Sequence, residues 1–278
     1  MLVKCLTNKK INMPELPEVE TIACNLRPEL TGRDIVSVTL LWPRTLASPS
    51  PELFTEQMIG QRILDVSRRA KYLNIQLVNY HLFIHLRMSG DLEMRSAASQ
   101  PQKHDRLILH LSDARQLVFS DPRKFGRVWL TAHPQDVISE LGPEPLDPAF
   151  TPLLLHARLH KRHRQVKPLL LDQAFLAGLG NIYTDEALHL SSLHPQRISD
   201  TISFQEVERL HAAIQTVLLA GIQHNGASFD WVYRGGNFQN YFRVYGRENQ
   251  PCPVCGTPVQ KITVGQRGTH FCPNCQVR

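Results

Sequence analysis

The chain has 278 residues, an apolar fraction of 42% and a formal net charge of +6. Its length is sufficient for two or three compact domains, and no apolar run approaches the about 20 residues that a helix needs to cross a bilayer. The first twelve residues lack the long apolar core and the cleavage site of a secretory signal. These observations argue against a membrane-spanning or secreted protein. They predict a soluble cytoplasmic one, whose basic charge weakly favours a polyanionic partner.

The amino-terminal part predicts a helix followed by a β-rich domain. Residues 14–30 carry apolar side chains at helical spacing, namely Val19, Ile22, Ala23 and Leu26. Pro17 suits the first turn of that helix. Apolar residues then alternate with others along four short segments, residues 36–42, 73–77, 82–88 and 107–111. Alternation with a period of two, with turn residues between the segments, predicts an antiparallel sandwich or barrel.

The carboxyl-terminal part predicts helices and a small cysteine-bearing module. A proline-rich stretch at residues 133–152 is typical of a linker. Helices are expected over residues 169–190, with a break at residues 178–180, and over residues 203–222. The apolar face of the second helix comprises Phe204, Val207, Leu210, Ile214, Val217 and Leu218. The chain is therefore predicted to be an α+β protein with three domains, at residues 14–132, 148–230 and 243–277.

Basic side chains are concentrated in two segments. Residues 156–168 contain five Lys or Arg, three His and no acid, and residues 231–278 contain six Lys or Arg and one acid, Glu248. A single charged run is usually a solvated face. Two runs on separate elements favour a surface that follows the phosphates of a nucleic acid.

Four of the six cysteines form two closely spaced pairs near the carboxyl terminus. Cys252 and Cys255 are separated by two residues, and so are Cys272 and Cys275. Two such turns supply the four thiolates of a tetrahedral zinc ion, and four protein ligands leave no open position for water. The spacing predicts one structural Zn²⁺; the alternative is two reduced dithiols without metal. Arg267 lies between the pairs, where a solvated hairpin tip is the simplest expectation.

Nine segments resemble the motifs of the formamidopyrimidine-DNA glycosylase family, in the family's order. They are PELPEVET at 14–21, RRAKYL at 68–73, HLRMSGDL at 85–92, DPRKFG at 121–126, LGPEPL at 141–146, GLGNIYTDEAL at 178–188, HPQR at 194–197, VYGR at 244–247 and QRGTHFCPNCQ at 266–276. The resemblance implies an amino-terminal β-sandwich with a leading helix, a helix–two-turn–helix domain and a carboxyl-terminal zinc finger. It also implies a monomeric, nucleoid-associated DNA-repair enzyme.

The resemblance implies a bifunctional DNA glycosylase and abasic-site lyase that acts on oxidised purines in double-stranded DNA. Pro14 matches the nucleophile, an amino-terminal proline whose secondary amine forms a Schiff base before β,δ-elimination. Glu15 matches the catalytic acid, although an acid here also complements the dipole of its own helix. Lys71 matches a lysine that contacts phosphate or sugar and transfers protons. Arg267 matches the finger arginine that holds the phosphates around the lesion.

Further residues match positions that contact DNA. Met88, Arg123 and Phe125 match the residues that fill the space left by an extruded base, although Met88 also suits a β-sheet core. Asn181 matches an asparagine that binds near the lesion, and its place before a helix also suits an N-cap. His104 matches a position at the DNA backbone. His163, with Lys161 and Arg162, falls where the family has a basic cluster.

Two features depart from the family's pattern. Thirteen residues precede Pro14, and a proline inside a chain has no free amine. Translation from Met13 and removal of that methionine would expose the amine, so residues 1–13 are not expected in the active enzyme. The stretch from Ser228 to Tyr241 is shorter than the usual lesion-recognition loop, and it contains Trp231 and Tyr233. Formamidopyrimidines are therefore the expected substrates, and 8-oxoguanine is left open.

Two rival functions remain open. One is a non-catalytic DNA-binding protein on the same scaffold, against which the run PELPE and Lys71 argue. The other is a glycosylase that prefers oxidised pyrimidines. Leu16, where the related endonuclease VIII group usually carries glycine, and the motif LGPEPL argue against it.

Overall fold

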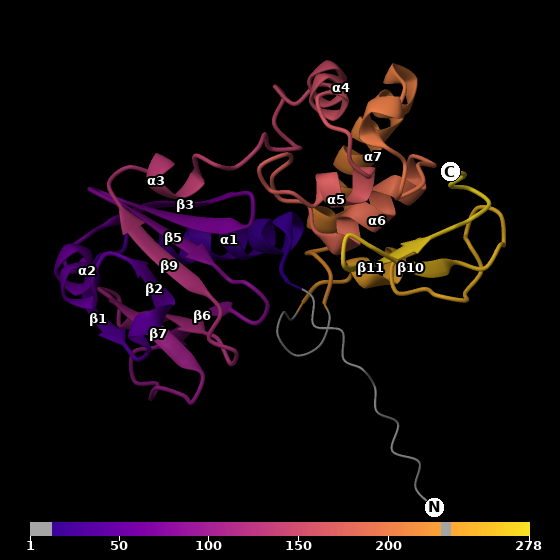
Figure 1. Cartoon of the computed structure of the whole chain (residues 1–278). Helices are drawn as coiled ribbons and strands as arrows, with labels where there is room; N and C mark the ends of the chain where they lie inside the picture. Colours follow the sequence, from indigo (N-terminus) through magenta and orange to yellow (C-terminus); the bar gives the residue numbers. More distant parts are fainter. Residues whose placement is uncertain (1–12, 229–234) are drawn as a thin grey trace, which may run out of the picture.

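The computed structural model describes residues 13–228 and 235–278. A β-rich part, a helical part and a small hairpin follow one another along the chain (Figure 1), and the predicted α+β fold is confirmed. Within the described ranges, no helix combines the length and apolar character that a membrane span requires.

The amino-terminal part is a sandwich of two sheets with a helix along its edge. Helix α1 spans Leu16–Leu30 and α2 spans Pro51–Met58. One sheet has the order β2-β9-β5-β4-β3 and the other β1-β7-β8-β6, and every described strand pair is antiparallel except β2 with β9. The strands are β1 Ile35–Leu40, β2 Leu46–Ser48, β3 Ile63–Arg69, β4 Tyr72–Leu77, β5 His81–His85, β6 Asp91–Ser96, β7 Asp105–Leu111, β8 Arg115–Ser120 and β9 Arg127–Thr131.

The apolar alternation predicted for the central strands is confirmed, and in β1 it holds for Val38 and Leu40, which pack against the same core, but fails at Val36. Leu73 and Ile75 of β4 are completely buried between the sheets, together with apolar residues of α1. In β1 the buried residue is Ile35, whereas Val36 is 51% exposed. A bulge between Ile35 and Ser37 shifts the register against β7, so the side chains change faces at this point.

The linker holds one short helix, α3 (Gln135–Ile138). Among the described residues, the helical part that follows has four α-helices: α4 Pro152–His160, α5 Val166–Leu170, α6 Asn181–Leu190 and α7 Phe204–Gln223. The predicted helix over residues 203–222 is confirmed, since Ser203 caps α7 through the amide of Glu206. Phe204 is 43% exposed and does not belong to the core as predicted. The basic segment 156–168, expected only as a charged run, supplies α4 and the start of α5.

Helix α6 lies between α7 and the carboxyl-terminal hairpin formed by β10 (Gln260–Val264) and β11 (Arg267–Phe271) (Figure 1). Asp185 of α6 pairs with Lys167 at 2.5 Å, and neither side chain is exposed. The same carboxylate accepts the amide of His270 in β11 at 2.9 Å. The assignment of Lys167 to a basic surface was therefore wrong, because its charge is paired inside the protein.

Replacing Lys167 with methionine is expected to lower the free energy of unfolding by about 3–5 kcal/mol, because Asp185 would remain as a buried, unpaired charge. Urea denaturation followed by circular dichroism measures the change. Arg164→Ala is the control: it removes an exposed pair with Asp172, and such pairs contribute about 0–1 kcal/mol. Equal losses in the two variants would contradict the prediction.

Candidate active site

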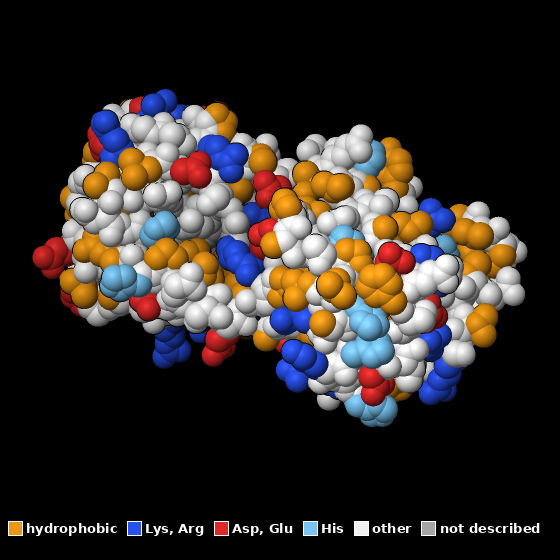
Figure 2. All heavy atoms as spheres, turned by 90° about the horizontal axis from the view of Figure 1, so that it is seen from above, with side chains coloured by type: hydrophobic (Ala, Val, Ile, Leu, Met, Phe, Trp, Pro, Cys, Tyr) orange, Lys and Arg blue, Asp and Glu red, His pale blue; other side chains and the backbone are white. Residues whose placement is uncertain are grey.

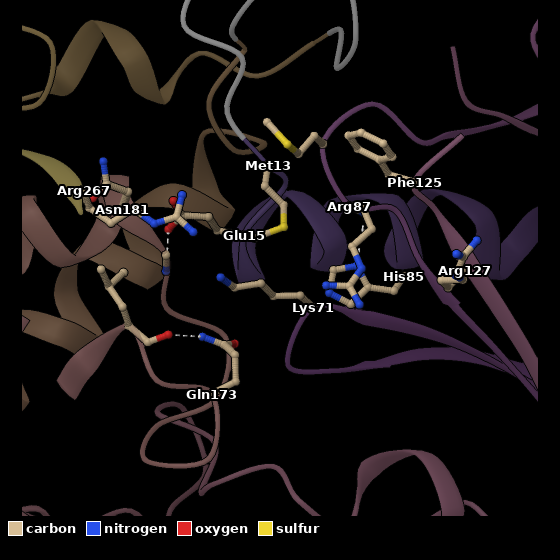
Figure 3. A pocket seen from close by; sticks show the side chains of 13 residues that line it. Met13, Glu15, Lys71, His85, Arg87, Phe125, Arg127, Gln173, Asn181 and Arg267 are labelled. Atoms are coloured by element: carbon tan, nitrogen blue, oxygen red, sulfur yellow. Dashed lines mark hydrogen bonds between the residues drawn. The ribbon is translucent and has the colours of Figure 1, made fainter. Parts of the chain in front are cut away.

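A cavity of about 710 Å³ opens where the sandwich, the helical part and the finger hairpin meet (Figure 3). Segments far apart in sequence line it: the start of α1, the β3–β4 turn, the loop after β5, the start of α6 and the β10–β11 turn. The lining residues are Met13, Glu15, Lys71, His85, Arg87, Met88, Phe125, Arg127, Leu171, Gln173, Gly180, Asn181 and Arg267. Six predicted site residues are thus brought together: Glu15, Lys71, Met88, Phe125, Asn181 and Arg267.

Glu15 is the N-cap of α1, and its carboxylate also caps helix α6. It accepts the backbone N–H groups of Gly180 at 2.8 Å, Ile182 at 2.9 Å and Tyr183 at 3.4 Å. A Cβ atom at Gly180 would lie 2.3 Å from the Cδ of Glu15, so only glycine leaves room for this contact. Asn181 is the first residue of α6 and Gly180 its N-cap. The prediction that Asn181 is the N-cap was therefore wrong.

Glu15 and Lys71 form a buried acid–base pair. Burial raises the pKa of Glu15 to about 7, against the opposing effects of Lys71 and the backbone donors. Burial lowers the pKa of Lys71, which Glu15 partly counteracts. The Lys71 side chain extends into the cavity below Glu15 (Figure 3). At neutral pH the cavity therefore holds an acid that can carry a proton and an amine that loses one more easily than usual.

The turn that carries Lys71 is fixed by the linker. Ala70 has a left-handed φ of 54°, and its amide donates to the carboxylate of Glu144 at 2.5 Å. The same carboxylate accepts from the guanidinium groups of Arg68 at 2.6 Å and Arg69 at 2.7 Å. One linker side chain thus fixes three consecutive residues that lead directly to Lys71.

Pro14 lies next to Glu15 and is buried, and Met13 lines the cavity in front of it. While Met13 is attached, the Pro14 nitrogen is an amide whose lone pair is delocalised into the carbonyl. Of the segment 1–13, which is not expected in the active enzyme, residues 1–12 lie outside the described residues.

Arg267 is exposed and lines the cavity at the start of β11 (Figure 3). Its position depends on the next residue, Gly268, whose carbonyl oxygen accepts from Asn181 Nδ2 at 3.0 Å and from Lys167 Nζ at 3.1 Å. Two donors from the helical part therefore hold the β10–β11 turn against the cavity. The Oδ1 atom of Asn181 is buried without a protein partner.

The remaining predicted residues lie around the rim or elsewhere. The Arg123 guanidinium stacks 4.7 Å above the Phe125 ring, beside the cavity. Met88 lies beyond the end of β5 and lines the cavity, so it is not part of the sandwich core. His104 accepts the amide of Asp121 at its carbonyl oxygen. His163 is 77% exposed and bonds to Asp200.

The exposed basic side chains of the segment 156–168 do not reach the cavity. Figure 2 looks onto the upper side of Figure 1, where α4 lies, and shows His, Lys and Arg side chains beside Asp and Glu on the helical lobe. Lys161, Arg162 and His163 are exposed, and none of them lines the cavity.

Sequence reasoning missed several lining residues, of which His85 and Arg87 have the clearest chemistry. Burial, with Arg87 and Lys71 nearby, lowers the pKa of His85 to about 3, so the ring is neutral. Its Nδ1 accepts the amide of Arg87 at 3.0 Å. Both residues belong to the motif HLRMSGDL, but alternation along β5 indicated only that His85 is a strand residue.

The loop expected to select the lesion falls partly outside the described residues. Residues 229–234, including Trp231 and Tyr233, are among those not described. Its two ends are held together: Ser228 Oγ accepts the Gly236 amide at 2.8 Å. The preceding amide, of Ala227, donates to Glu18 of α1 at 2.7 Å. Helix α1 therefore contacts both the cavity and the base of this loop.

The four predicted cysteines converge on one point. All four Sγ atoms lie within 4.8 Å of one another, and three of their separations are 3.4, 3.5 and 3.9 Å. Thiolates at about 2.3 Å from a tetrahedral Zn²⁺ would lie about 3.8 Å apart. The amides of Val254 and Cys275 also donate to Sγ atoms of the cluster. The donor set therefore fits a structural zinc ion.

Comparisons with known proteins cover nearly the whole chain. Residues 13–128 match the formamidopyrimidine-DNA glycosylase N-terminal domain, residues 141–231 its H2TH domain, and residues 249–277 a zinc finger found in FPG and IleRS. The formamidopyrimidine-DNA glycosylases of Chloroflexus aggregans and Pelotomaculum thermopropionicum are 46% and 44% identical, over 95% of this chain and 99% of each relative. A Lactococcus lactis FPG mutant in complex with Fapy-dG-containing DNA has a TM-score of 0.89 at 36% identity, over 95% of this chain and 100% of that one.

The cysteine cluster holds a structural zinc ion, which leads to a direct test. Cys272→Ser is expected to lose the zinc and lower the thermal unfolding temperature, because the apolar cluster of the finger is small and consists of Val244, Val259 and three of the cysteines. Elemental analysis and calorimetry measure the two effects. Cys24→Ser is the matched control, since Cys24 is exposed and lies outside the cluster. Retention of one zinc per chain by the Cys272 variant would contradict the assignment.

Proposed function

The chain belongs to the formamidopyrimidine-DNA glycosylase family, and from that premise we propose that it is a bifunctional glycosylase and abasic-site lyase of base excision repair. Its substrate is double-stranded DNA that contains oxidised purines or abasic sites, and it acts in the cytoplasm at the nucleoid. The observation that carries this proposal is the convergence of Glu15, Lys71 and Arg267 on one cavity, directly beside Pro14.

Pro14 supplies the nucleophile once it is the first residue of the chain. Its secondary amine attacks C1′ of the deoxyribose, the bond from C1′ to the base breaks, and the amine loses its proton. The bond from C1′ to the ring oxygen then breaks, the ring oxygen takes up a proton, and an iminium ion remains between C1′ and the Pro14 nitrogen. An α-amino group has a pKa of about 7.7–8.0, so a useful fraction is unprotonated at neutral pH. The iminium then withdraws electrons from C2′, which loses a proton as the bond to the 3′ phosphate breaks.

Glu15 and Lys71 move the protons of this sequence. A carboxyl group with a pKa of about 7 can protonate the ring oxygen of the sugar as the ring opens. Lys71, whose pKa burial lowers, is placed to contact the sugar or its phosphate and to exchange protons during elimination. Because burial raises the pKa of Glu15 and lowers that of Lys71, Glu15 suits the role of acid and Lys71 that of base.

The DNA is held from two sides of the cavity. Arg267 and Asn181 offer donors to the phosphates that flank the lesion, while Met88, Arg123 and Phe125 on the sandwich side fill the space left by the extruded base. His104 and His163 lie outside the cavity lining and would contact the DNA backbone farther from the lesion.

The substrate class rests on the relatives. Solved proteins of similar fold are bound to DNA that contains Fapy-dG, carbocyclic 8-oxo-G or an oxidised pyrimidine. Formamidopyrimidines are the substrates proposed for this chain, with 8-oxoguanine as a further purine. The oxidised-pyrimidine complex keeps a pyrimidine preference as the second candidate.

Borohydride trapping on damaged duplex DNA tests the nucleophile. The protein that begins at Pro14 is expected to form a covalent adduct, and the protein that retains Met1–Met13 is not, because an amide nitrogen cannot attack C1′. Mass spectrometry confirms the terminus of each form. Equal trapping of the extended form would exclude Pro14 and direct attention to Lys71. No trapping of either form would favour a non-catalytic DNA-binding protein. Oligonucleotides with purine or pyrimidine lesions rank the substrates in the same assay.

The pKa of Glu15 predicts a pH dependence. The single-turnover rate of base excision is expected to follow a bell-shaped pH profile: it rises as the Pro14 amine, with a pKa of about 7.7–8.0, loses its proton, and it falls as the protonated form of Glu15 is depleted above about pH 7. Glu15→Gln is expected to slow excision about 100-fold or more. Glu20→Gln, on the same helix and paired with Arg68, is the control. A Glu15→Gln variant with unchanged excision and pH profile would rule out the acid role.

A further inference from the structure

Two loops of the sandwich carry the residues proposed to enter the DNA. The loop between β5 and β6 carries Met88, and the loop between β8 and β9 carries Arg123 and Phe125. The loops are about 35 residues apart in sequence, and the strands that flank them pair, β5 with β9 as far as His85 and Arg127, and β6 with β8 from Asp91 and Ser120. Strand pairing therefore places the two loops side by side, and contacts within the loops decide how their tips lie.

One buried carboxylate joins the two loops. Asp121 is completely buried, and its Oδ1 accepts from the Ser89 hydroxyl and from the Arg123 amide at 3.1 Å. Its Oδ2 accepts from the Gly126 amide at 2.7 Å. The three donors are the residue that follows Met88, Arg123 itself, and the residue that follows Phe125. A single side chain thus fixes the backbone beside each of the three residues.

An aromatic ring closes the same junction from the inside. Phe119, which is 1% exposed, packs against both loops at a glycine. A Cβ atom at Gly90 would lie 2.9 Å from the ring, and one at Gly126 would lie 2.4 Å from it. The two loops therefore close on one ring and one carboxylate, and neither can shift without disturbing a contact of the other.

The β8–β9 loop is also restrained at its tip. Lys124, between Arg123 and Phe125, has a left-handed φ of 61°, and its ammonium lies 3.7 Å from the centre of the Trp42 ring. Since Lys124 contacts Trp42, the guanidinium of Arg123 and the ring of Phe125 are left to stack on each other beside the cavity.

We propose that Asp121 is a positioning residue that couples the two loops, with Ser89 as its link to the first, so that Met88, Arg123 and Phe125 enter the duplex as one unit. This inference rests on the proposed function, because Asp121 takes part in no chemical step and acts only through those three residues. Removing the Ser89 hydroxyl keeps all three side chains but removes the bond that joins the Met88 loop to Asp121.

The test compares two reactions of zinc-loaded protein that begins at Pro14. Excision of a formamidopyrimidine from duplex DNA requires base extrusion, and cleavage at a preformed abasic site requires less of it. Both rates are measured under single-turnover conditions for Ser89→Ala, Phe125→Ala and the double variant. Substituting Asp121 itself would also leave backbone amides unpaired and could unfold the sandwich, so the hydroxyl is the better target. Ser191→Ala is the matched control, since Ser191 is similarly buried and its hydroxyl bonds to Ala187 within α6.

Ser89→Ala is expected to slow excision roughly tenfold, the effect of one hydrogen bond to a charged group, and to slow abasic-site cleavage much less. Ser191→Ala should leave the ratio of the two rates unchanged. The double variant should be little slower than Phe125→Ala alone, because the coupled unit is already broken.

Two results would overturn the coupling while leaving the proposed function intact: an unchanged rate ratio in Ser89→Ala beside a changed one in Phe125→Ala, or losses that multiply in the double variant. An unchanged ratio in Phe125→Ala as well would overturn the space-filling role itself, and this inference with it.

Discussion

The contact between the Glu15 carboxylate and the first turn of α6 is the constraint on which the rest of the site depends. It joins residues about 165 positions apart in sequence, and it uses the backbone amides that a helix leaves unpaired at its start. The acid that serves the chemistry is therefore also the cap of a helix in another part of the chain. Because Gly180 has no side chain, the carboxylate can approach closely enough to be buried, and that burial raises its pKa into the neutral range.

Helix α6 extends this constraint to the carboxyl-terminal hairpin. Asp185 holds Lys167 and the amide of His270, and Glu186 accepts three consecutive amides, from Arg243 to Tyr245. Each acid of the helix is buried and matched by donors from a different segment. The sandwich, the helical part and the finger are thus arranged around one helix, which explains how residues from all three meet at the cavity.

Patterns within short segments predicted the strands, helices and metal cluster well. They did not predict which residues far apart in the sequence contact one another. Alternation identified the core of β4 and β5, and cysteine spacing identified the metal cluster, because both signals lie within short segments. Asn181 shows the opposite case: the local rule assigned it as a cap, but a carboxylate from the other end of the chain performs that role. The basic segment 156–168 likewise gave no sign that Lys167 is paired with Asp185. In β1, a bulge of one residue was enough to exchange the faces.

The linker carboxylate Glu144 has a mechanical consequence. It is bound to Arg68, Arg69 and the amide of Ala70, and Arg69 also donates to the carbonyl oxygen of Gly142 at 2.6 Å. The segment that connects the two lobes is therefore attached to the turn that precedes Lys71. The position of Lys71 relative to Glu15 therefore depends on a carboxylate that does not line the cavity, and a change in the linker would reach the reactive pair through this turn.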